Sequence, residues 1–363
     1  MKRSQSSKSI LNRRQFLRGA INSLAAISVM PAYVAGIAAE APPSRKVNLA
    51  FVGIGGRGAT NLESMESENV LALCDVDSER AAASFAKYPQ AKQFKDYRRM
   101  LDALDKQLDG VVVSTPDHTH AVIAMEAMRR GKHVYCEKPL AHSVGEIRKL
   151  MQAAHQYKVT TQLGNQGHSF ETIRTFCEWI WDGAIGPVHT VHAACGSNYS
   201  RIAKLPLLAE KHPVPATLDW EQWLGPAAFR PYHPLYLPGS WRGWTPFGSG
   251  AIGDWFCHVV DPVFWALDLG SATAVHARVK GYDPKLHADT FPLGTVVTYE
   301  FPANGKRGPV KLVWYEGEEK PPRPAELEPD DKLPTTGAVV IGEKATIGFI
   351  REVRVWNDEG HRV

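Results

Sequence analysis

The sequence predicts an α/β protein that begins with a doubly wound parallel sheet, and three observations carry this prediction. Residues 47 to 52 form a short apolar run of the kind found in buried parallel strands. The run leads directly into a turn with the spacing G-x-G-x-x-G. As far as residue 136, further apolar runs alternate with stretches of helical periodicity, which is the pattern of successive βαβ units.

The first 39 residues are predicted to be an export signal rather than part of the fold. Arg13 and Arg14 form a twin-arginine pair, a moderately apolar stretch begins at Gly19, and small residues near Ala39 provide a cleavage zone. This order is typical of a signal for the Tat export machinery. Polar residues and Pro31 interrupt the apolar stretch and argue against a membrane span, although retention as an uncleaved anchor stays open. We therefore expect a periplasmic or otherwise extracytoplasmic protein.

The charge and the cysteine content of the mature chain limit what kind of protein it can be. Removing residues 1–39 takes away six of the 42 basic residues and leaves 36 against 38 acidic ones, a net charge of −2. No basic patch for nucleic acid is expected from this balance. Roughly 320 mature residues suffice for two domains. The five cysteines show no C-x-x-C spacing and are interpreted as buried thiols rather than a disulfide framework.

The glycine-rich turn predicts a dinucleotide site, because each of its glycines serves a separate purpose. Gly53 permits the tight turn, Gly55 lets the backbone approach a pyrophosphate, and Gly58 allows the next helix to pack closely. Amide groups and the positive end of the helix dipole then face the ligand. A packing role stays open for the motif taken alone. The turn residues expected at the cofactor are Gly53, Ile54, Gly55, Gly56, Arg57 and Gly58.

A second apolar strand, residues 70–74, ends in an acidic residue. Asp75 lies about 20 residues after the turn, where a carboxylate binds ribose hydroxyls and disfavours a 2′-phosphate. This favours NAD over NADP, although the nearby Arg80 weakens the preference. The alternative is that Asp75 caps a helix starting near Asp77, and the two roles are compatible.

The alternation of helices and strands continues to a lysine that follows a strand. We expect helices at 77–87, 97–104 and up to Arg130, and strands at 92–94, 110–114 and 132–136. Between them, His118 and His120 are interpreted as helix-start or cofactor contacts, because their spacing and the lack of a nearby third ligand disfavour a metal. Lys138, beside Glu137, is expected where the nicotinamide half of a dinucleotide lies, and its amine suits a substrate hydroxyl. A plain surface lysine is the alternative.

The stretch from Gly250 to Pro262 supplies a partner for this lysine. In a helix, Asp254, His258 and Asp261 would share one face. Histidine suits a general base, because its ordinary pKa of about 6.5 lies near neutrality. An internal hydrogen bond and half of a metal site are the alternatives. Pro262 predicts a kink at the end of this face.

These residues occur together in the order found in one family. From Lys46 onward, the chain resembles the Gfo/Idh/MocA family of glucose–fructose oxidoreductases and inositol dehydrogenases. The resemblance rests on Gly53–Gly58, Asp75, Ser114–His118, Glu137–Pro139 and Asp254-x-x-x-His258. It implies a Rossmann NAD-binding domain over residues 46–166. It also implies a C-terminal α/β domain over residues 167–363, whose large, open, mostly antiparallel sheet forms one wall of the substrate cleft.

The resemblance also implies roles for individual residues. Lys138, Asp254 and His258 would form the catalytic group, with His258 taking the hydroxyl proton as hydride passes to the nicotinamide. The further cofactor contacts would be Ser114, Thr115, Pro116, His118, Glu137 and Lys138. Gly164–His168 and Trp241–Phe247 resemble stretches of exported members that act on carbohydrates.

Aromatic residues in these stretches suit a sugar. Trp241, Trp244 and Trp255 could stack on a pyranose, while Arg242, Asn165 and His168 hydrogen-bond its hydroxyls. A place in the core is the alternative for each tryptophan. The proline-rich segment 205–247 is expected to form a semi-rigid flap over the cleft.

The rest of the chain is predicted to build the second sheet. Strands are expected at 188–194, 274–279, 295–301 and 310–315, and an exposed loop at 316–334. The family usually continues past its final strands with a segment that packs toward the cleft. This chain stops at Val363, soon after residues 351–356, so we expect a second domain shortened at its C-terminal end.

The sequence therefore predicts an NAD(P)-dependent oxidoreductase that transfers a hydride between a secondary alcohol of a sugar, glycoside or cyclitol and its cofactor. Because free NAD is not expected outside the cytoplasm, whereas the Tat route carries folded proteins, the cofactor is expected to be tightly bound. Two alternatives stay open, an NAD-dependent glycosidase acting by transient oxidation and elimination, and a non-catalytic carbohydrate-binding or regulatory relative. A homo-oligomer is expected.

Overall fold

The strand order of the first sheet is that of a doubly wound nucleotide-binding fold. The computed structural model describes residues 46–324, 333, 335–349 and 353–357. Its first sheet has the order β3-β2-β1-β4-β5-β6, with every neighbouring pair parallel, so the predicted sheet is confirmed. The strands are β1 (Asn48–Val52), β2 (Asn69–Cys74), β3 (Lys92–Phe94), β4 (Gly110–Val113), β5 (His133–Glu137) and β6 (Thr161–Gly164).

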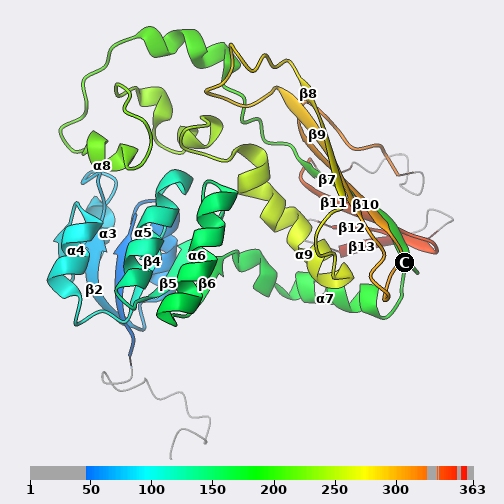
Figure 1. Ribbon diagram of the computed structural model, residues 1–363, viewed down its shortest axis with the longest axis horizontal. Coiled ribbons are helices and arrows are strands. Elements are labelled where there is room, and N and C mark those ends of the chain that lie inside the picture. Colours follow the sequence, from blue (N-terminus) through cyan, green and yellow to red (C-terminus); the bar gives the residue numbers. More distant parts are fainter. Residues whose placement is uncertain (1–45, 325–332, 334, 350–352, 358–363) are drawn as a thin grey trace, which may run out of the picture. The chain divides into compact units, whose positions relative to one another are not determined.

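Helices cover both faces of this sheet (Figure 1). Successive residues of β1 alternate between two cores, because side chains of a strand point to opposite faces: Ala50 and Val52 belong to one and Phe51 to the other. Leu62 of α2 packs into the second core, and Leu101 of α4 into the first. The helices are α2 (Arg57–Ser64), α3 (Ala82–Lys87), α4 (Tyr97–Leu104), α5 (Asp117–Arg129) and α6 (Val144–Tyr157).

Helix α3 begins at Ala82, so the predicted start at Asp77 is wrong. The Asp77 carboxylate accepts the main-chain N–H groups of Glu79 and Arg80, which holds this stretch in a turn. Asp77 also forms an antiparallel bridge with Leu218, far along the chain. A contact of that range is invisible to helical periodicity.

The second sheet is mixed and mostly antiparallel, as predicted. In the order β13-β12-β11-β7-β10-β9-β8, only the pair β7 and β10 runs parallel. The strands are β7 (Val188–Cys195), β8 (Ala274–Lys280), β9 (Gly294–Phe301), β10 (Val310–Gly317), β11 (Gly337–Gly342), β12 (Ala345–Phe349) and β13 (Val353–Asn357). Residues 318–324 contain no helix or strand, as expected of an exposed loop, and most of the remaining predicted loop lies outside the described residues.

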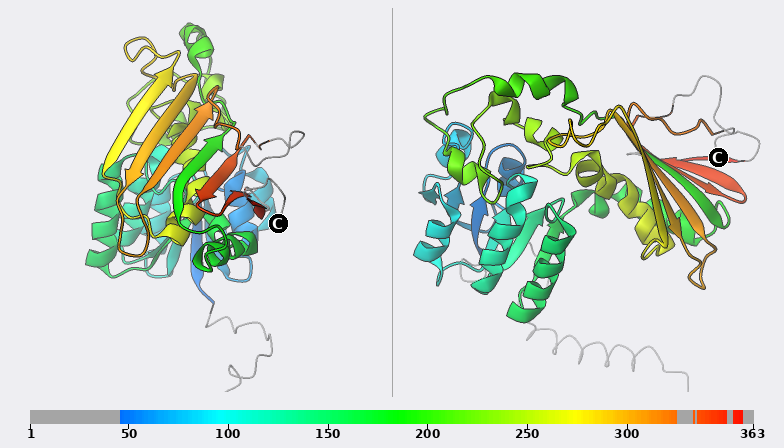
Figure 2. Two further views of the ribbon diagram at one scale, coloured as in Figure 1. Left: turned by 90° about the vertical axis from the view of Figure 1, so that its right-hand side faces the viewer. Right: turned by 45° about the horizontal axis from the view of Figure 1, so that its top comes forward.

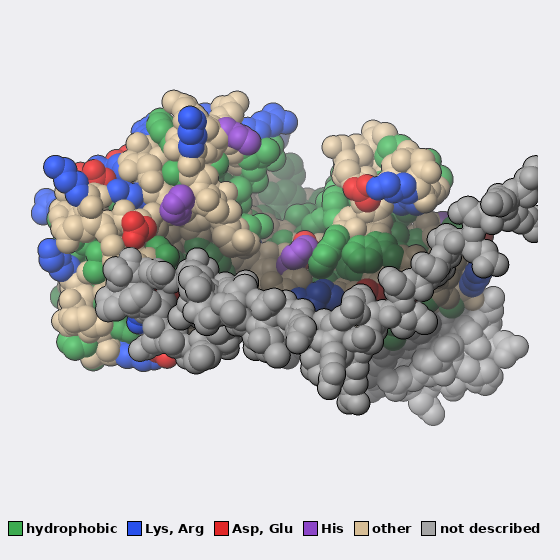
Figure 3. Space-filling view, turned by 90° about the horizontal axis from the view of Figure 1, so that it is seen from below, with side chains coloured by type: hydrophobic (Ala, Val, Ile, Leu, Met, Phe, Trp, Pro, Cys, Tyr) green, Lys and Arg blue, Asp and Glu red, His purple; other side chains and the backbone are tan. Residues whose placement is uncertain are grey.

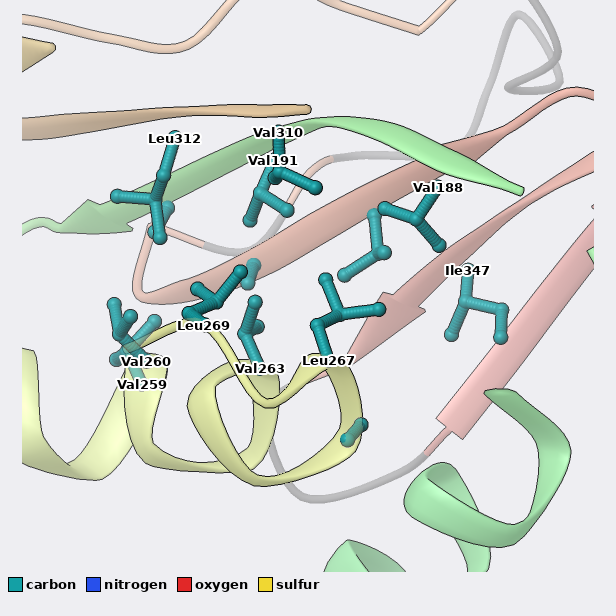
Figure 4. Close-up of a cluster of buried hydrophobic side chains, with 14 of the residues drawn as sticks. Val188, Val191, Val259, Val260, Val263, Leu267, Leu269, Val310, Leu312 and Ile347 are labelled. Carbon is teal, nitrogen blue, oxygen red and sulfur yellow. The ribbon is translucent and has the colours of Figure 1, made fainter. Parts of the chain in front are cut away.

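Two helices cover one face of this second sheet, whereas in Figure 2 no described helix lies over the opposite face. Helix α9 (Cys257–Leu267) contacts β7 and β11, and α7 (Glu171–Trp181) contacts β13. Figure 4 shows Val260 and Val263 of α9 pointing toward Val191 and Leu312 of the sheet. All four side chains are buried, and burying each contributes about 1.5–3 kcal/mol relative to exposure. This packing fixes the helix that carries His258.

Residues 196–250, which lie between β7 and the start of the helical region that leads into α9, are here called the connecting segment. It contains η4 (Ile202–Ala209), α8 (Trp220–Leu224), η5 (Pro234–Tyr236) and η6 (Ser240–Gly243). Its aromatic side chains form a separate core that includes Trp220, Trp223, Tyr236, Trp244 and Phe247. Main-chain hydrogen bonds join it to the turn that follows β2, since Ser78 N–H donates to Thr217 O at 3.0 Å and Asp219 N–H donates to Val76 O at 2.9 Å. The predicted flap is therefore a folded layer with its own core.

The predicted export signal and the C-terminal residues 358–363 lie outside the described residues. Of the helices that the structure describes, none combines the length and apolar character needed to span a membrane. On the face shown in Figure 3, described basic and acidic side chains are interspersed, and histidine and hydrophobic side chains meet in a hollow.

Candidate active site

A cleft of about 800 Å³ lies at the carboxyl ends of the strands of the first sheet. The strand order reverses between β1 and β4, and open α/β sheets bind their ligands at such a point. Gly53, Ser114 and Lys138 line one side, and Trp223 of the connecting segment lines another. None of the described strands of the second sheet lines the cleft. The expected sheet wall is therefore wrong, because the connecting segment and α9 lie in that place.

The glycine-rich turn has the geometry that its sequence predicts, with one correction. Gly53 has φ +77°, and a Cβ on Gly58 would collide with the carbonyl oxygen of Gly53, so α2 packs directly on the turn. Gly55 and Gly56 line the cleft, whereas Ile54 is fully buried in the core. Ile54 and Gly58, expected at the cofactor, do not line the cleft and instead serve packing.

Asp75 is held by main-chain N–H groups at the end of β2. Its carboxylate accepts from Ile54 N–H at 2.9 Å and from Asp77 N–H at 3.0 Å. Burial raises the pKa of Asp75, and these hydrogen bonds oppose the rise. The Arg80 side chain lies against Gly55 in the same cleft. The Asp75 carboxylate and the Arg80 guanidinium therefore lie together at the place where the ribose of the cofactor is expected.

Glu137 at the end of β5 fastens the turn to the middle of the sheet. Its Oε1 accepts from Arg57 Nε at 3.0 Å and from Asn61 Nδ2 at 2.8 Å, and Asn61 also donates to Ser114 Oγ at 3.0 Å. Asn61 belongs to no motif, so the sequence offers no signal for it.

The two histidines after β4 face main-chain carbonyls rather than the cleft. His118 is buried between Trp223 and Phe247, and its Nε2 lies 3.0 Å from Trp223 O. The expected cofactor contact of His118 is therefore wrong, because α8 covers its ring. His120 bonds to the carbonyls of Thr115 and Pro139. Thr115 and Pro116 themselves line the cleft, as expected.

Lys138 meets Asp254, as the sequence predicts from two distant segments. Lys138 Nζ donates to Asp254 O at 3.0 Å and to the carboxylate oxygen Oδ1, while the Tyr199 hydroxyl donates to Oδ2. Arg242 Nε lies 3.2 Å from Oδ1 without the alignment of a hydrogen bond, so it acts as a charge. Burial alone would raise the pKa of Asp254, but Arg242 and Lys138 lower it below its ordinary value. Burial and Asp254 raise the pKa of Tyr199, which keeps its proton.

His258 lies where the π-helical turn η7 (Ile252–Phe256) passes into α9. Its ring lines the cleft and meets Trp255 edge-on, with centroids 5.9 Å apart. Burial, followed by the Lys138 charge, lowers the pKa of His258 below its ordinary value. Within the described part of the chain, no group hydrogen-bonds this ring. The ring is therefore neutral near pH 7 and free to accept a proton.

Helix α9 continues through Pro262 to Leu267, and its irregular turn lies before His258 rather than at the proline. Asp261 is not part of the cleft, because its carboxylate is 2.8 Å from His168 Nδ1. His168 in turn stacks on Trp265, which is 37% exposed. The predicted acidic face is thus divided between the cleft and the outer surface.

The expected sugar contacts fall into three groups. Trp241 and Arg242 line the cleft, with the guanidinium 4.3 Å from the indole centroid. Trp244 is fully buried and donates to Leu235 O, so its expected stacking on a sugar is wrong. Asn165 and His168 lie outside the residues that line the cleft. Asn165 Nδ2 instead donates to Cys257 O at 3.3 Å, which fixes the start of α9.

Glu210, His212 and His233 bring ligand atoms within 4.8 Å of one another on the connecting segment. However, His233 Nδ1 accepts the N–H of Leu235 at 3.1 Å. A neutral ring then carries its proton on Nε2 and has no lone pair to offer there. We assign no metal to this cluster.

Fold and site together define a two-domain protein in which a Rossmann domain supplies the dinucleotide site and a second α/β domain supplies groups for chemistry. Residues 47–165 match the model "Oxidoreductase family, NAD-binding Rossmann fold", and residues 183–315 match "Oxidoreductase family, C-terminal alpha/beta domain". The chain belongs to the Gfo/Idh/MocA oxidoreductase family.

Several known proteins are similar to this chain. Inositol 2-dehydrogenase of Salmonella typhimurium (strain LT2) is 33% identical over 108 residues, 28% of this chain and 32% of the relative. Levoglucosan dehydrogenase of Pseudarthrobacter phenanthrenivorans is 25% identical over 244 residues, 66% of this chain and 52% of the relative. The matches thus span about a third to a half of these curated relatives.

A solved structure shares the fold. The inositol dehydrogenase homolog from Azotobacter vinelandii, crystallised with NADH and myo-inositol, superposes with a TM-score of 0.61. It is 18% identical, and the match covers 88% of this chain and 75% of that one. At this identity the likeness concerns the fold alone.

Proposed function

We propose that this protein is an NAD-dependent dehydrogenase that oxidises a secondary alcohol of a sugar or cyclitol. One observation carries the proposal: Lys138, Asp254 and His258 belong to the same site as the dinucleotide turn. The names of the relatives, an inositol 2-dehydrogenase and a levoglucosan dehydrogenase, support a polyhydroxylated substrate.

The residues of the cleft fit a bound nicotinamide dinucleotide. Gly55 and Gly56 present backbone without side chains, which leaves room for a pyrophosphate at the start of α2. The Asp75 carboxylate suits ribose hydroxyls and favours NAD. Arg80 would tolerate a 2′-phosphate, so NADP is the weaker ligand in this proposal.

The roles of the side chains follow from their contacts. When bound, the nicotinamide accepts hydride from the alcohol carbon or returns it. Lys138 donates a hydrogen bond to the substrate hydroxyl and is kept in place by Asp254. Tyr199 and Arg242 hold the Asp254 carboxylate from its other sides. His258, a neutral base, takes the hydroxyl proton as the carbonyl forms.

Two side chains of the cleft would orient the sugar. The Trp241 indole could stack on a sugar ring through the face that the Arg242 guanidinium does not cover. Arg242 lines the same cleft, so the other N–H groups of its guanidinium would donate to a substrate hydroxyl. Asn165 acts indirectly by fixing α9, and His168 belongs to the outer surface.

The connecting segment is proposed to retain the cofactor. Leu218, Gln222 and Trp223 line the cleft opposite the Rossmann strands. Gln222 Nε2 also donates to Asp96 at 3.2 Å, which adds a side-chain tie to those of the main chain. Release of the dinucleotide therefore requires this layer to move.

Denaturing the purified protein tests retention and identity of the cofactor together. We expect roughly one nicotinamide nucleotide per chain in the supernatant. Its absence, combined with no binding of added NADH, would count against the proposed function.

A substrate screen tests the chemistry. Monosaccharides, glycosides and inositols are added singly, and the absorbance of the bound nicotinamide is followed. The proposal is supported if a sugar or cyclitol reduces the bound nicotinamide of the wild-type protein and if Lys138→Ala and His258→Ala abolish this reduction. Release of nitrophenol from nitrophenyl glycosides without net reduction would replace it with the glycosidase, and no response with retained ligand binding would favour a binding protein.

Export by the Tat machinery is a separate proposal, supported by Arg13 and Arg14 and the apolar stretch behind them. The test is a fusion of residues 1–45 to a reporter that is active only after export. Arg13→Lys with Arg14→Lys should abolish its activity, and an unaffected reporter would contradict the proposal.

Light scattering of the mature protein tests the proposed homo-oligomer.

A further inference from the structure

His120, in the first turn of α5, is a buried histidine that none of the steps above uses. Its side chain is 1% exposed. Nδ1 lies 2.7 Å from the carbonyl oxygen of Pro139, and Nε2 lies 2.8 Å from the carbonyl oxygen of Thr115. Carbonyl oxygens only accept hydrogen bonds, whereas a neutral imidazole has one N–H and one lone pair. Both bonds form only if both ring nitrogens carry a proton.

The surroundings stabilise such a charged ring. Asp117, one turn earlier on the same helix, is 2% exposed, and its carboxylate interacts with the charge of His120. Burial disfavours the charged ring, but Cys136 of β5, Asp117 and the Pro139 carbonyl outweigh it and raise the pKa of His120 to about 9. Burial raises the pKa of Asp117, and the charges of His120 and Arg242 oppose this rise.

His118, two residues earlier, provides an internal comparison. One of its ring nitrogens faces a carbonyl, that of Trp223, and the other is buried with no hydrogen-bond partner. Burial lowers the pKa of His118 to about 4. Two buried rings on one helix thus differ in charge, because His120 has a carbonyl at each nitrogen and Cys136 and Asp117 beside it, whereas burial dominates at His118.

The two carbonyls belong to the loops that frame the chemical end of the cleft. Thr115 lines the cleft after β4, and Pro139 follows Lys138 after β5. Thr119, beside His120, bonds Thr115 through their hydroxyls at 2.8 Å. A cation between the loops holds both backbones by charge-assisted hydrogen bonds, which are about twice as strong as neutral ones.

We propose that His120 is a positioning residue, a permanently charged imidazolium that clamps the Thr115 and Pro139 carbonyls and so sets the direction of Lys138. The proton stays on the ring during turnover. Its part in catalysis rests on the proposed function, whereas its charge does not.

NMR of the full chain labelled with ¹⁵N-histidine tests the charge without any substrate. The signals lost in His120→Gln identify the ring. At pH 7 we expect both of its nitrogens to be protonated, whereas the His118 ring, identified through His118→Gln, is neutral. A neutral His120 ring at pH 7 would overturn the proposal. If a variant folds poorly, through-space contacts of the ring protons in the wild-type protein assign the signals instead, so the charge is still tested. In Asp117→Asn, the ring should lose a proton at lower pH than in the wild type, and an unchanged titration would contradict the pairing.

Kinetics test the positioning. Once a substrate is known, His120→Gln should lower kcat more than it changes KM, because the amide cannot replace two N–H donors on opposite sides of a ring. His120→Lys keeps the charge and should restore part of the loss. Equal loss in both variants, or an effect confined to KM, would refute the positioning role. Failure of the wild type to turn over any sugar would concern the proposed function alone and leave the NMR result intact.

Discussion

The tightest packing at the dinucleotide turn gives the sharpest prediction: Gly58→Ala should lose most of its cofactor affinity while the chain still folds. A Cβ on Gly58 would lie 1.8 Å from the carbonyl oxygen of Gly53, and such atoms essentially never approach closer than 3.0 Å. Helix α2 must therefore move away from β1 by roughly 1 Å or more, and it carries Gly55, Gly56 and Arg57 with it. Overpacking of this size costs about 1–3 kcal/mol. A misplacement of about 1 Å can cost an enzyme about 100-fold in rate, and we expect a loss of cofactor affinity here because the displaced groups are those that would hold the pyrophosphate.

The assay has two readings, the nucleotide released per chain on denaturation and the midpoint of urea unfolding. Gly145→Ala in α6 is the matched control, because a Cβ there meets only Ser143 Oγ at 3.9 Å. This control should keep its nucleotide and gain up to about 1 kcal/mol of stability from helix propensity. A folded Gly58→Ala protein with wild-type nucleotide content and NADH affinity would refute the reasoning.

The remaining predictions concern the groups around Lys138. Because burial and the Lys138 charge lower the pKa of His258 below 6.5, kcat/KM should stay level near neutrality and fall only below pH 6.5. His258→Asn should remove this limb together with about 10²–10⁴-fold of the rate, measured by initial velocities across pH. The unfolded ring protonates first, so His258 also contributes stability above pH 6.5 that is lost as the pH falls through its folded-state pKa. Tyr199→Phe should cost about 1–3 kcal/mol in kcat/KM by leaving Asp254 Oδ2 without its donor, and Tyr157→Phe should leave kcat/KM unchanged. Trp244→Ala should lower the free energy of unfolding by about 3–5 kcal/mol and leave KM for the sugar unchanged. Trp241 belongs to the same core and also lines the cleft, so Trp241→Ala should both destabilise the fold and raise KM. A large KM effect with little destabilisation in Trp244→Ala would contradict the buried role of Trp244.

The first sheet could be predicted well from the sequence, because buried parallel strands consist of runs of consecutive apolar residues. Val111, Val112 and Val113 of β4 are all buried, and their run is unmistakable. In contrast, strand β6 begins at Thr161 and its first three residues are exposed. No apolar pattern in the sequence therefore predicts this strand. The start of α3 was misplaced because Asp77 pairs with Leu218, a contact that local periodicity does not encode.

The candidate site could be predicted where residues belong to motifs, and not where they act through long-range contacts. Lys138 and Asp254 lie 116 positions apart and meet as expected. Tyr199, which completes the hydrogen bonding of Asp254 from 55 positions away, follows β7 in a stretch without a motif. Trp244 shows the converse, since its place beside Arg242 suggests a sugar contact, but other aromatic residues of the connecting segment bury it.

The connecting segment links cofactor retention to catalysis, because one layer forms part of both ends of the cleft. Near the Rossmann strands it contributes Leu218 and Trp223, and near the chemistry it contributes Trp241 and Arg242. Arg242 is also one of the two cations that keep Asp254 ionised. Lifting the layer to release a dinucleotide would withdraw Arg242 from Asp254 and leave this largely buried carboxylate with one cation fewer, at a cost beyond that of the main-chain ties. Under the proposed function, the same contacts that hold Asp254 and Lys138 in place would therefore also oppose loss of the cofactor.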